Sequence, residues 1–139
     1  ATGKLTVEIK DKQGNVKETR ELENLVVDDG LAFIASRMKD ATATAMSHMA
    51  IGTGTTAAAS GDSALGTEAA RVALTSTTVT TNAVAYVCSF AAGTGTGAIT
   101  EAGILNAAST GTLLCRTVFS VVNKGASDSM TITWTVTIS

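Results

Sequence analysis

Apolar and polar residues alternate without a break along residues 130–138. One face of this stretch takes the apolar residues Met130, Ile132, Trp134, Val136 and Ile138. The other face takes the threonines Thr131, Thr133, Thr135 and Thr137. A period of two is typical of a β-strand with one buried face. We therefore predict a central or interface-lining strand with Trp134 in the core, and a threonine face that is either solvated or an interaction surface.

The same alternation predicts a hairpin in residues 1–23. Leu5, Val7 and Ile9 alternate with polar residues, the segment DKQGN is typical of a turn, and residues 16–22 run back. Both strands carry charges on their outer face. This favours a solvated hairpin or a sheet edge.

Helical spacing occurs in one place, residues 28–40. Leu31, Ile34 and Met38 recur at i, i+3 and i+7, which predicts a helix whose apolar stripe faces the core. Asp28 or Asp29 can cap its N-terminus, and basic residues follow in the last turn, where the helix dipole favours them.

Residues 46–139 show strand patterns throughout. We predict strands at 46–52, 71–80, 83–91, 98–105 and 112–122, besides the one at 130–138. Hairpin turns are expected near Thr81–Asn82 and at residues 106–111. About eight strands and one helix, separated by Gly, Ser and Thr turns, predict a mainly β protein. The expected fold is a single antiparallel β-sandwich domain spanning 1–139, jelly-roll-like or immunoglobulin-like, with one short helix near the N-terminus.

Charge is distributed unevenly along the chain. Residues 1–40 hold fifteen of the 22 charged residues, and residues 41–139 hold seven. Globular proteins are usually about 25% charged, so this body is poor in charge. Either its hydroxyl groups suffice for solubility or an assembly covers much of its surface, and we favour the assembly. The sequence has no cluster of basic residues of the kind that binds nucleic acid, so no nucleic-acid partner is expected. No apolar run approaches the roughly 18–20 residues of a membrane span, so no membrane partner is expected.

One motif suggests a nucleotide site. Gly52, Gly54 and Ala57 satisfy the G-x-G-x-x-G/A spacing of a dinucleotide-binding turn. Such a turn must open a helix, whereas Gly61, Asp62 and Gly66 break any helix here, and no P-loop lysine is present. We therefore predict an irregular loop, with glycines that permit positive φ, and no cofactor. The segment GTGTG at 93–97 has the same composition and predicts a second loop.

Other candidate chemistry is sparse. His48 is the only histidine, which excludes a histidine-based metal cluster and favours a structural role. Glu101 stands alone in an apolar run, and we expect it to pair with Arg71 or Arg116 or to point outward. Cys88 and Cys115 are expected to be free, buried thiols of a protein made in a reducing cytosol, with a single bridge as the minor alternative. No catalytic, cofactor-binding or metal-binding residue is predicted.

Several segments together resemble a recurring type of tailed-bacteriophage virion protein. The pattern is N-L-V and a helix, H-x-A-[IV]-G-T-G-T-T, E-x-x-R, I-x-E-x-G-[IL] and a terminal I-T-W-T-[IV], and it covers residues 24–139. Proteins with this pattern occur as capsid cement (decoration) proteins and as tail-fibre or baseplate components. The resemblance implies a structural role without catalysis. A cement protein of this kind is a jelly-roll-like β domain on the outer capsid surface.

The compact length and the charge-poor body favour the cement protein. The expected partners are the major capsid protein and a second copy of the chain, because symmetric shells favour two-fold contacts. The expected location is the capsid surface of a virion, after synthesis in the host bacterial cytoplasm. A tail component is the alternative. A glycan-binding sandwich is less favoured, because Trp134 and Tyr86 lie on faces predicted to point inward.

Overall fold

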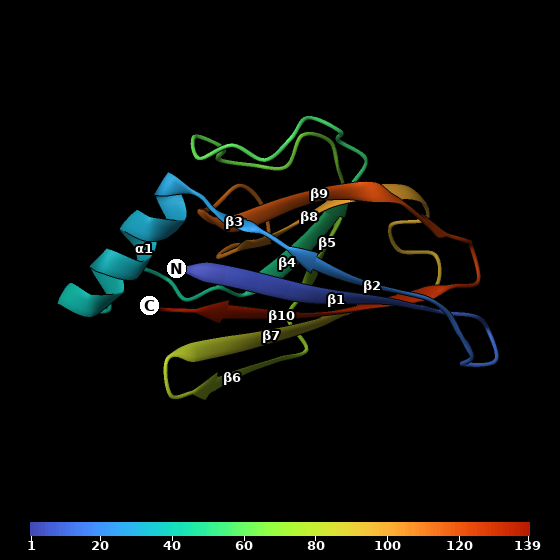
Figure 1. The fold of residues 1–139 in the computed structure, drawn as a ribbon, viewed down its shortest axis with the longest axis horizontal. Helices are drawn as coiled ribbons and strands as arrows, with labels where there is room; N and C mark the ends of the chain where they lie inside the picture. The colour runs from blue at the N-terminus through green and yellow to red at the C-terminus, as the bar shows by residue number, and fades with distance from the viewer.

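Two antiparallel β-sheets pack face to face in the computed structural model, which describes all of residues 1–139 (Figure 1). The first sheet has the strand order β2-β1-β10-β7-β6. Its strands are β1 (Thr2–Lys10), β2 (Val16–Glu23), β6 (Ser76–Thr80), β7 (Ala83–Phe90) and β10 (Ser129–Thr137). The charged N-terminal hairpin is therefore one edge of this sheet, as predicted.

The second sheet has the strand order β3-β9-β8-β4-β5. Its strands are β3 (Leu25–Val26), β4 (His48–Gly52), β5 (Glu68–Ala73), β8 (Gly97–Leu105) and β9 (Leu113–Lys124). The predicted β-sandwich is confirmed. The first and last long strands, β1 and β10, pair side by side, as in a jelly roll, while four of the connections are hairpins that stay within one sheet.

The core lies between the sheets and follows the alternation in the sequence. Met130, Ile132, Trp134 and Val136 of β10 are all buried, and Trp134 has no exposed surface. Strand β10 is central in its sheet, where Trp134 lies opposite Leu5 of β1 and Tyr86 of β7. The central strand with a buried tryptophan is confirmed. Ile138 is an exception, because it lies beyond the end of β10 and is 40% exposed.

Strand division differs from the sequence prediction at residues 71–80. This run is two strands, β5 in the second sheet and β6 in the first, and the chain crosses between the sheets at Leu74 and Thr75. The run has strand-forming residues throughout, so nothing in the pattern marks the crossing. The two-residue strand β3 also escaped prediction, and the total is ten strands rather than about eight.

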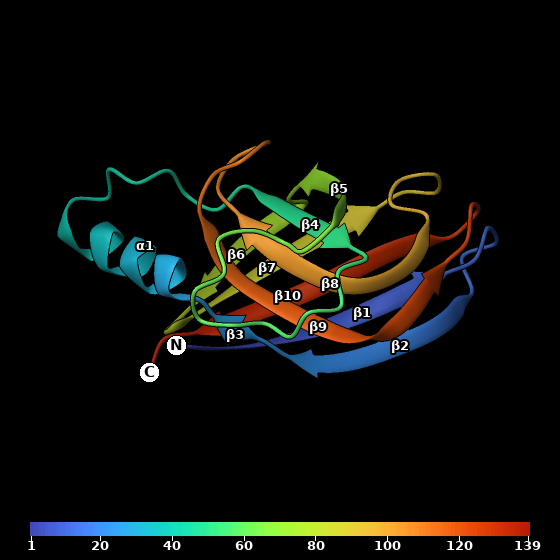
Figure 2. The same cartoon turned by 90° about the horizontal axis from the view of Figure 1, so that it is seen from above.

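The helix α1 (Asp28–Lys39) lies at one end of the sandwich and projects beyond it (Figure 2). Its N-cap residue is Val27, which makes no side-chain cap, so the prediction that Asp28 or Asp29 caps the helix is wrong. Both aspartates lie in the first turn instead, where their negative charges interact favourably with the helix dipole. Gly30 is the buried residue of the helix, and a Cβ there would collide with the Leu114 carbonyl of β9.

The prediction that the helical stripe faces the core is wrong for two of its three residues, Leu31 and Met38. Leu31 is 46% exposed and Met38 is 82% exposed, while Ile34 is partly buried against the core together with Phe33. The reason is the position of the helix. Its N-terminal half lies against the sandwich, where Gly30 meets β9 and where Phe33 and Ile34 pack on the core, and its C-terminal end extends past the ends of the strands.

Cys88 and Cys115 are free, buried thiols, as predicted. Burial raises the pKa of Cys88 to about 11 and that of Cys115 further still. Because the thiolate is the reactive form, we expect neither cysteine to react with a soluble thiol reagent in the native protein at about pH 8. Both should react once denaturant is added. Rapid labelling of the native chain, followed by mass spectrometry, would contradict this expectation.

Candidate functional site

Glu101 of β8 has no exposed surface and is the centre of a buried polar cluster. Its Oε2 accepts hydrogen bonds from the backbone N–H groups of Gly54 and Thr67, and its Oε1 accepts one from Gly66, each at 2.7 Å. All three donors lie in or at the end of the long loop 53–67 between β4 and β5. This loop crosses the outer face of the second sheet (Figures 1 and 2).

Arg116 of β9 completes the cluster. Its Nε and Nη2 lie 3.1 and 3.0 Å from Glu101 Oε1, and its Nη1 lies 2.8 Å from Asp62 Oδ2 in the loop. Of the two arginines predicted as partners of Glu101, the structure selects Arg116. The other, Arg71, forms an ion pair with Glu68. We refer to Glu101, Arg116 and Asp62 as the Glu101 cluster.

The cluster keeps Glu101 ionised. Burial pushes its pKa upward, but the N–H groups of Thr67, Gly66 and Gly54 and the Arg116 guanidinium outweigh burial, so the pKa lies below its ordinary value. A carboxylate that accepts this many hydrogen bonds is held in place rather than left open to a reactant. The arrangement therefore anchors the loop 53–67 to β8 and β9.

The G-x-G motif belongs to this anchor. No helix follows it, as predicted. Gly52 and Gly54 do not adopt positive φ, so that part of the prediction is wrong. They are needed for space, because a Cβ on Gly54 would collide with the Glu101 carboxylate and one on Gly52 with the Thr67 carbonyl. Positive φ occurs in the second glycine-rich loop, at 93, 95 and 97.

His48 forms no metal site. It is partly buried at the start of β4, and its Nδ1 lies 2.8 Å from the Ser47 hydroxyl. The structure contains no group of three or more His, Cys, Asp or Glu residues that could hold a metal ion.

The charged residues of the body are mostly withdrawn from its surface. Of the seven in residues 41–139, Glu68 alone is an exposed residue, and it is paired with Arg71. Lys124 is buried and donates to the carbonyls of Ala91 and Asp128. The Asp128 carboxylate in turn accepts from Lys17 of the N-terminal hairpin. The body therefore presents a surface almost free of unpaired charge.

The outward side of three strands of the first sheet, β10, β7 and β6, illustrates this. Strand register and burial place small uncharged residues on the outward side of β10, β7 and β6. We call this surface the threonine face, and it consists of Thr131, Thr133, Thr135, Thr137, Ala83, Ala85, Val87, Ser89, Ser76, Thr78 and Thr80. Covering a sheet face of this composition costs less hydration free energy than covering a charged face, and its hydroxyls can form hydrogen bonds with a partner.

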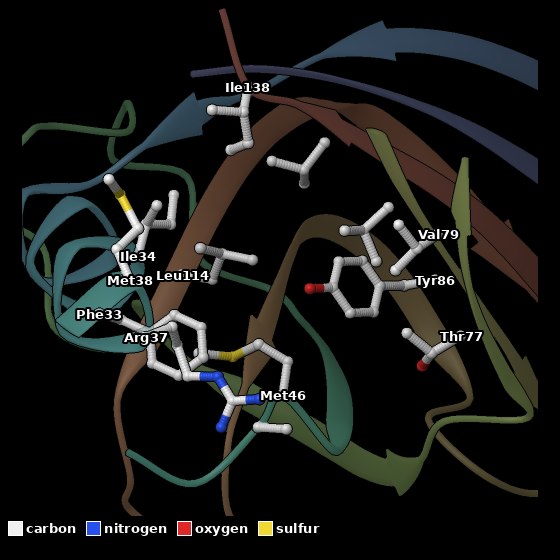
Figure 3. A pocket seen from close by; sticks show the side chains of 13 residues that line it. Phe33, Ile34, Arg37, Met38, Met46, Thr77, Val79, Tyr86, Leu114 and Ile138 are labelled. Carbon is white, nitrogen blue, oxygen red and sulfur yellow. The ribbon is translucent and has the colours of Figure 1, made fainter. Parts of the chain in front are cut away.

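An apolar groove of about 390 Å³ opens between α1 and the end of the first sheet (Figure 3). Eleven of its thirteen lining residues are hydrophobic. They come from α1, the segment after it, β6, β7, β9 and the C-terminal end of the chain, and include Met38, Val79 and Ile138, which are exposed. Exposed apolar side chains gathered around a groove mark an interaction surface.

Three polar side chains line the groove, those of Tyr86, Arg37 and Thr77. Tyr86 is 7% exposed and its hydroxyl points into the groove, where the structure gives it no hydrogen bond (Figure 3). Arg37 supplies the one charge among the lining residues and donates through Nη1 to the carbonyls of Ala41 and Ala43. The groove is thus mainly apolar, with the hydroxyl groups of Tyr86 and Thr77 and the Arg37 guanidinium at its wall.

Burial raises the pKa of Tyr86 to about 12. The unfolded chain ionises its tyrosine near pH 10, so the contribution of Tyr86 to the free energy of unfolding should be constant below that pH and fall as the pH rises from 10 towards 12. Tyr86 is the only tyrosine, so ultraviolet absorbance reports its ionisation directly. Titration at the ordinary value in the folded protein would show that the groove is fully hydrated.

Comparison with protein-family models, with curated proteins and with solved structures finds no match to this chain. The helix α1 is neither long nor apolar enough to cross a membrane, and it is the only helix.

Proposed function

We propose that this chain is a non-enzymatic structural protein of a bacteriophage virion. In this proposal it acts as a capsid cement protein, which binds the outer capsid surface and stabilises contacts between neighbouring major capsid subunits. The observation that carries the proposal is the surface of the body, where six of seven charged residues are buried or partly buried and the seventh is paired. The resemblance of residues 24–139 to phage virion proteins supplies the partner.

The threonine face is the surface proposed to lie on the capsid. Covering hydroxyl groups that form hydrogen bonds with the partner costs less than covering charged groups, which cost several kcal/mol each unless they are paired. The binding free energy of each single contact would be small. A closed shell repeats the contact many times, and a ligand that touches two subunits gains from effective concentration.

The test uses capsids that lack the protein and measures how the purified chain binds them. We expect the chain to bind the outer surface and to raise the temperature at which the particles break. Thr135→Lys, which places a charge on the threonine face, should weaken binding about tenfold or more. Ser109→Lys, at an exposed residue in the turn between β8 and β9 of the second sheet, is the control and should bind like the wild type.

Two results would overturn the assignment to the capsid. One is that capsids without the protein withstand heat and low salt as well as complete ones. The other is that labelled protein is found only on the tail. The second result would favour a tail-fibre or baseplate component.

A further inference from the structure

The four edges of the two sheets differ in how they resist pairing with another strand. The edge strand β2 carries Lys17, Glu18, Arg20, Glu21 and Glu23. Strand β5 carries the Glu68–Arg71 ion pair, and β3 is two residues long. Charges and short length are devices that keep sheet edges from associating.

Strand β6 has none of these devices. Its five residues, Ser76–Thr80, are all exposed and include no charge, proline or glycine. It pairs with β7 on one side, in a regular register without a bulge, and has no strand on the other side. The outer edge of β6 therefore offers unpaired backbone N–H and C=O groups to another strand.

The apolar groove lies directly beside this open edge. Thr77 and Val79 of β6 line it, and Val79 is 70% exposed. Met38, 82% exposed, and Ile138 lie at the same end of the molecule. An unprotected strand edge and an exposed apolar patch thus occur together, whereas the other three edges carry a protective feature.

We propose that β6 pairs antiparallel with β6 of a second copy of this chain. Centred on Thr78, the pairing places Thr77 opposite the partner's Val79 and Ser76 opposite the partner's Thr80. The result is one continuous ten-stranded sheet with a two-fold axis at Thr78. Pairs of β-branched residues are favourable across strands, and no like charges face each other in this register.

The distribution of charge favours a second copy as the occupant. The ten charged residues of segment 1–23 lie on the hairpin that forms the opposite edge of the same sheet. Two copies that meet at β6 therefore keep their charged hairpins as far apart as the sheet allows. Each copy also brings the same uncharged edge, as a two-fold interface requires.

This pairing has a consequence for the threonine face. The two-fold axis is perpendicular to the continuous sheet, so the threonine faces of both copies lie side by side on one surface. A pair would present a doubled face and could reach two neighbouring coat subunits. The pairing itself requires only the chain, so it can be tested separately from the proposed function.

Thiol cross-linking tests the register. In Thr78→Cys the two introduced thiols meet at the two-fold axis, and oxidation should link most of the protein as a disulfide-bonded dimer. Thr19→Cys, an exposed residue on the opposite edge strand, is the control and should stay largely monomeric. Cys88 and Cys115 are buried with raised pKa values, so they should not compete.

Sedimentation of the uncross-linked chain tests the interface. A five-residue strand pair is small, so we expect a dimer that dissociates on dilution into the micromolar range. Val79→Lys should raise the dissociation constant about tenfold or more, because it brings a charge to the apolar side of the new pair. Val16→Lys, on an exposed valine of β2, should leave it unchanged.

Three results would overturn the proposal. The chain could remain monomeric at about millimolar concentration, or Thr78→Cys could cross-link no better than Thr19→Cys. A dimer that Val79→Lys does not weaken would use another surface. Because no capsid is present in these experiments, their failure would leave the proposed cement function standing, and failure of the capsid experiment would leave the pairing standing.

Discussion

Replacement of Trp134 by alanine is expected to lower the free energy of unfolding by about 3–5 kcal/mol. The side chain has no exposed surface and lies on the central strand of the first sheet, between Leu5 and Tyr86. Its removal would leave a large cavity between the two sheets. Chemical denaturation followed by circular dichroism measures the loss, since the substitution removes the only tryptophan and with it the fluorescence signal.

A second substitution separates the contribution of Trp134 packing to stability from the cost of its unpaired N–H group. The Trp134 Nε1 group is buried without a hydrogen-bond partner, and such a donor costs about 1–3 kcal/mol. Trp134→Phe removes that donor and leaves a smaller cavity, so it should cost less than half as much as Trp134→Ala. Val121→Ala, at a valine that is 45% exposed, is the control and should change stability by less than about 1 kcal/mol. If Trp134→Ala unfolds like the wild type, the proposed core is wrong.

The strand content could be predicted from the sequence because a strand with one buried face imposes a period of two. This signal is local and unbroken in β10 and clear in β1 and β7. The crossing from β5 to β6 left no such signal. Leu74 and Thr75 continue the strand-forming composition, and a change of sheet alters the partner of a residue rather than its own propensity.

The helix shows a second limit of local patterns. The spacing of Leu31, Ile34 and Met38 correctly predicts that these residues share one side of a helix. Whether another layer covers that side depends on where the strands end, and here α1 extends past them. The same geometry that exposes Met38 also leaves the groove open. The apolar stripe therefore predicts the helix, but it does not predict the open apolar groove beside it.

The Glu101 cluster could be predicted only in part. An acid alone in an apolar strand indicates a buried ion pair, and the sequence predicts Arg71 or Arg116 as its partner. The backbone donors are 34 to 47 residues away in sequence, in a loop with no regular structure. The G-x-G spacing was the available signal for them. The glycines are needed because the Glu101 carboxylate lies against them, and only the folded structure brings this carboxylate close to the loop.

Glu101→Gln is expected to lower the free energy of unfolding by about 3–5 kcal/mol, the range for breaking a buried ion pair. Glutamine has one acceptor oxygen, so its amide group would face an N–H donor that Glu101 now satisfies, and Arg116 would lose part of its charge partner. Glu68→Gln is the matched control. It breaks an ion pair at the surface, where the loss should be about 1 kcal/mol or less.

The site of the damage should distinguish an anchor from general instability. Because three loop amides depend on this carboxylate, Glu101→Gln should speed proteolysis and hydrogen exchange within 53–67 more than in β1 or β10. Uniform loss of protection across the sandwich would contradict this role.

The pH dependence gives an independent test of the same carboxylate. The folded pKa of Glu101 is lowered from 4.5, so its contribution is present above that pH and is lost as the pH falls through the folded value. Asp62 and Asp128, whose pKa values are also lowered, act in the same direction. Wild-type stability should therefore decline below about pH 4.5, and Glu101→Gln should show a shallower decline because it has lost one of these groups. Equal slopes in the two proteins would mean that folding does not lower the pKa of Glu101, and would contradict its role as an ionised partner of the loop amides.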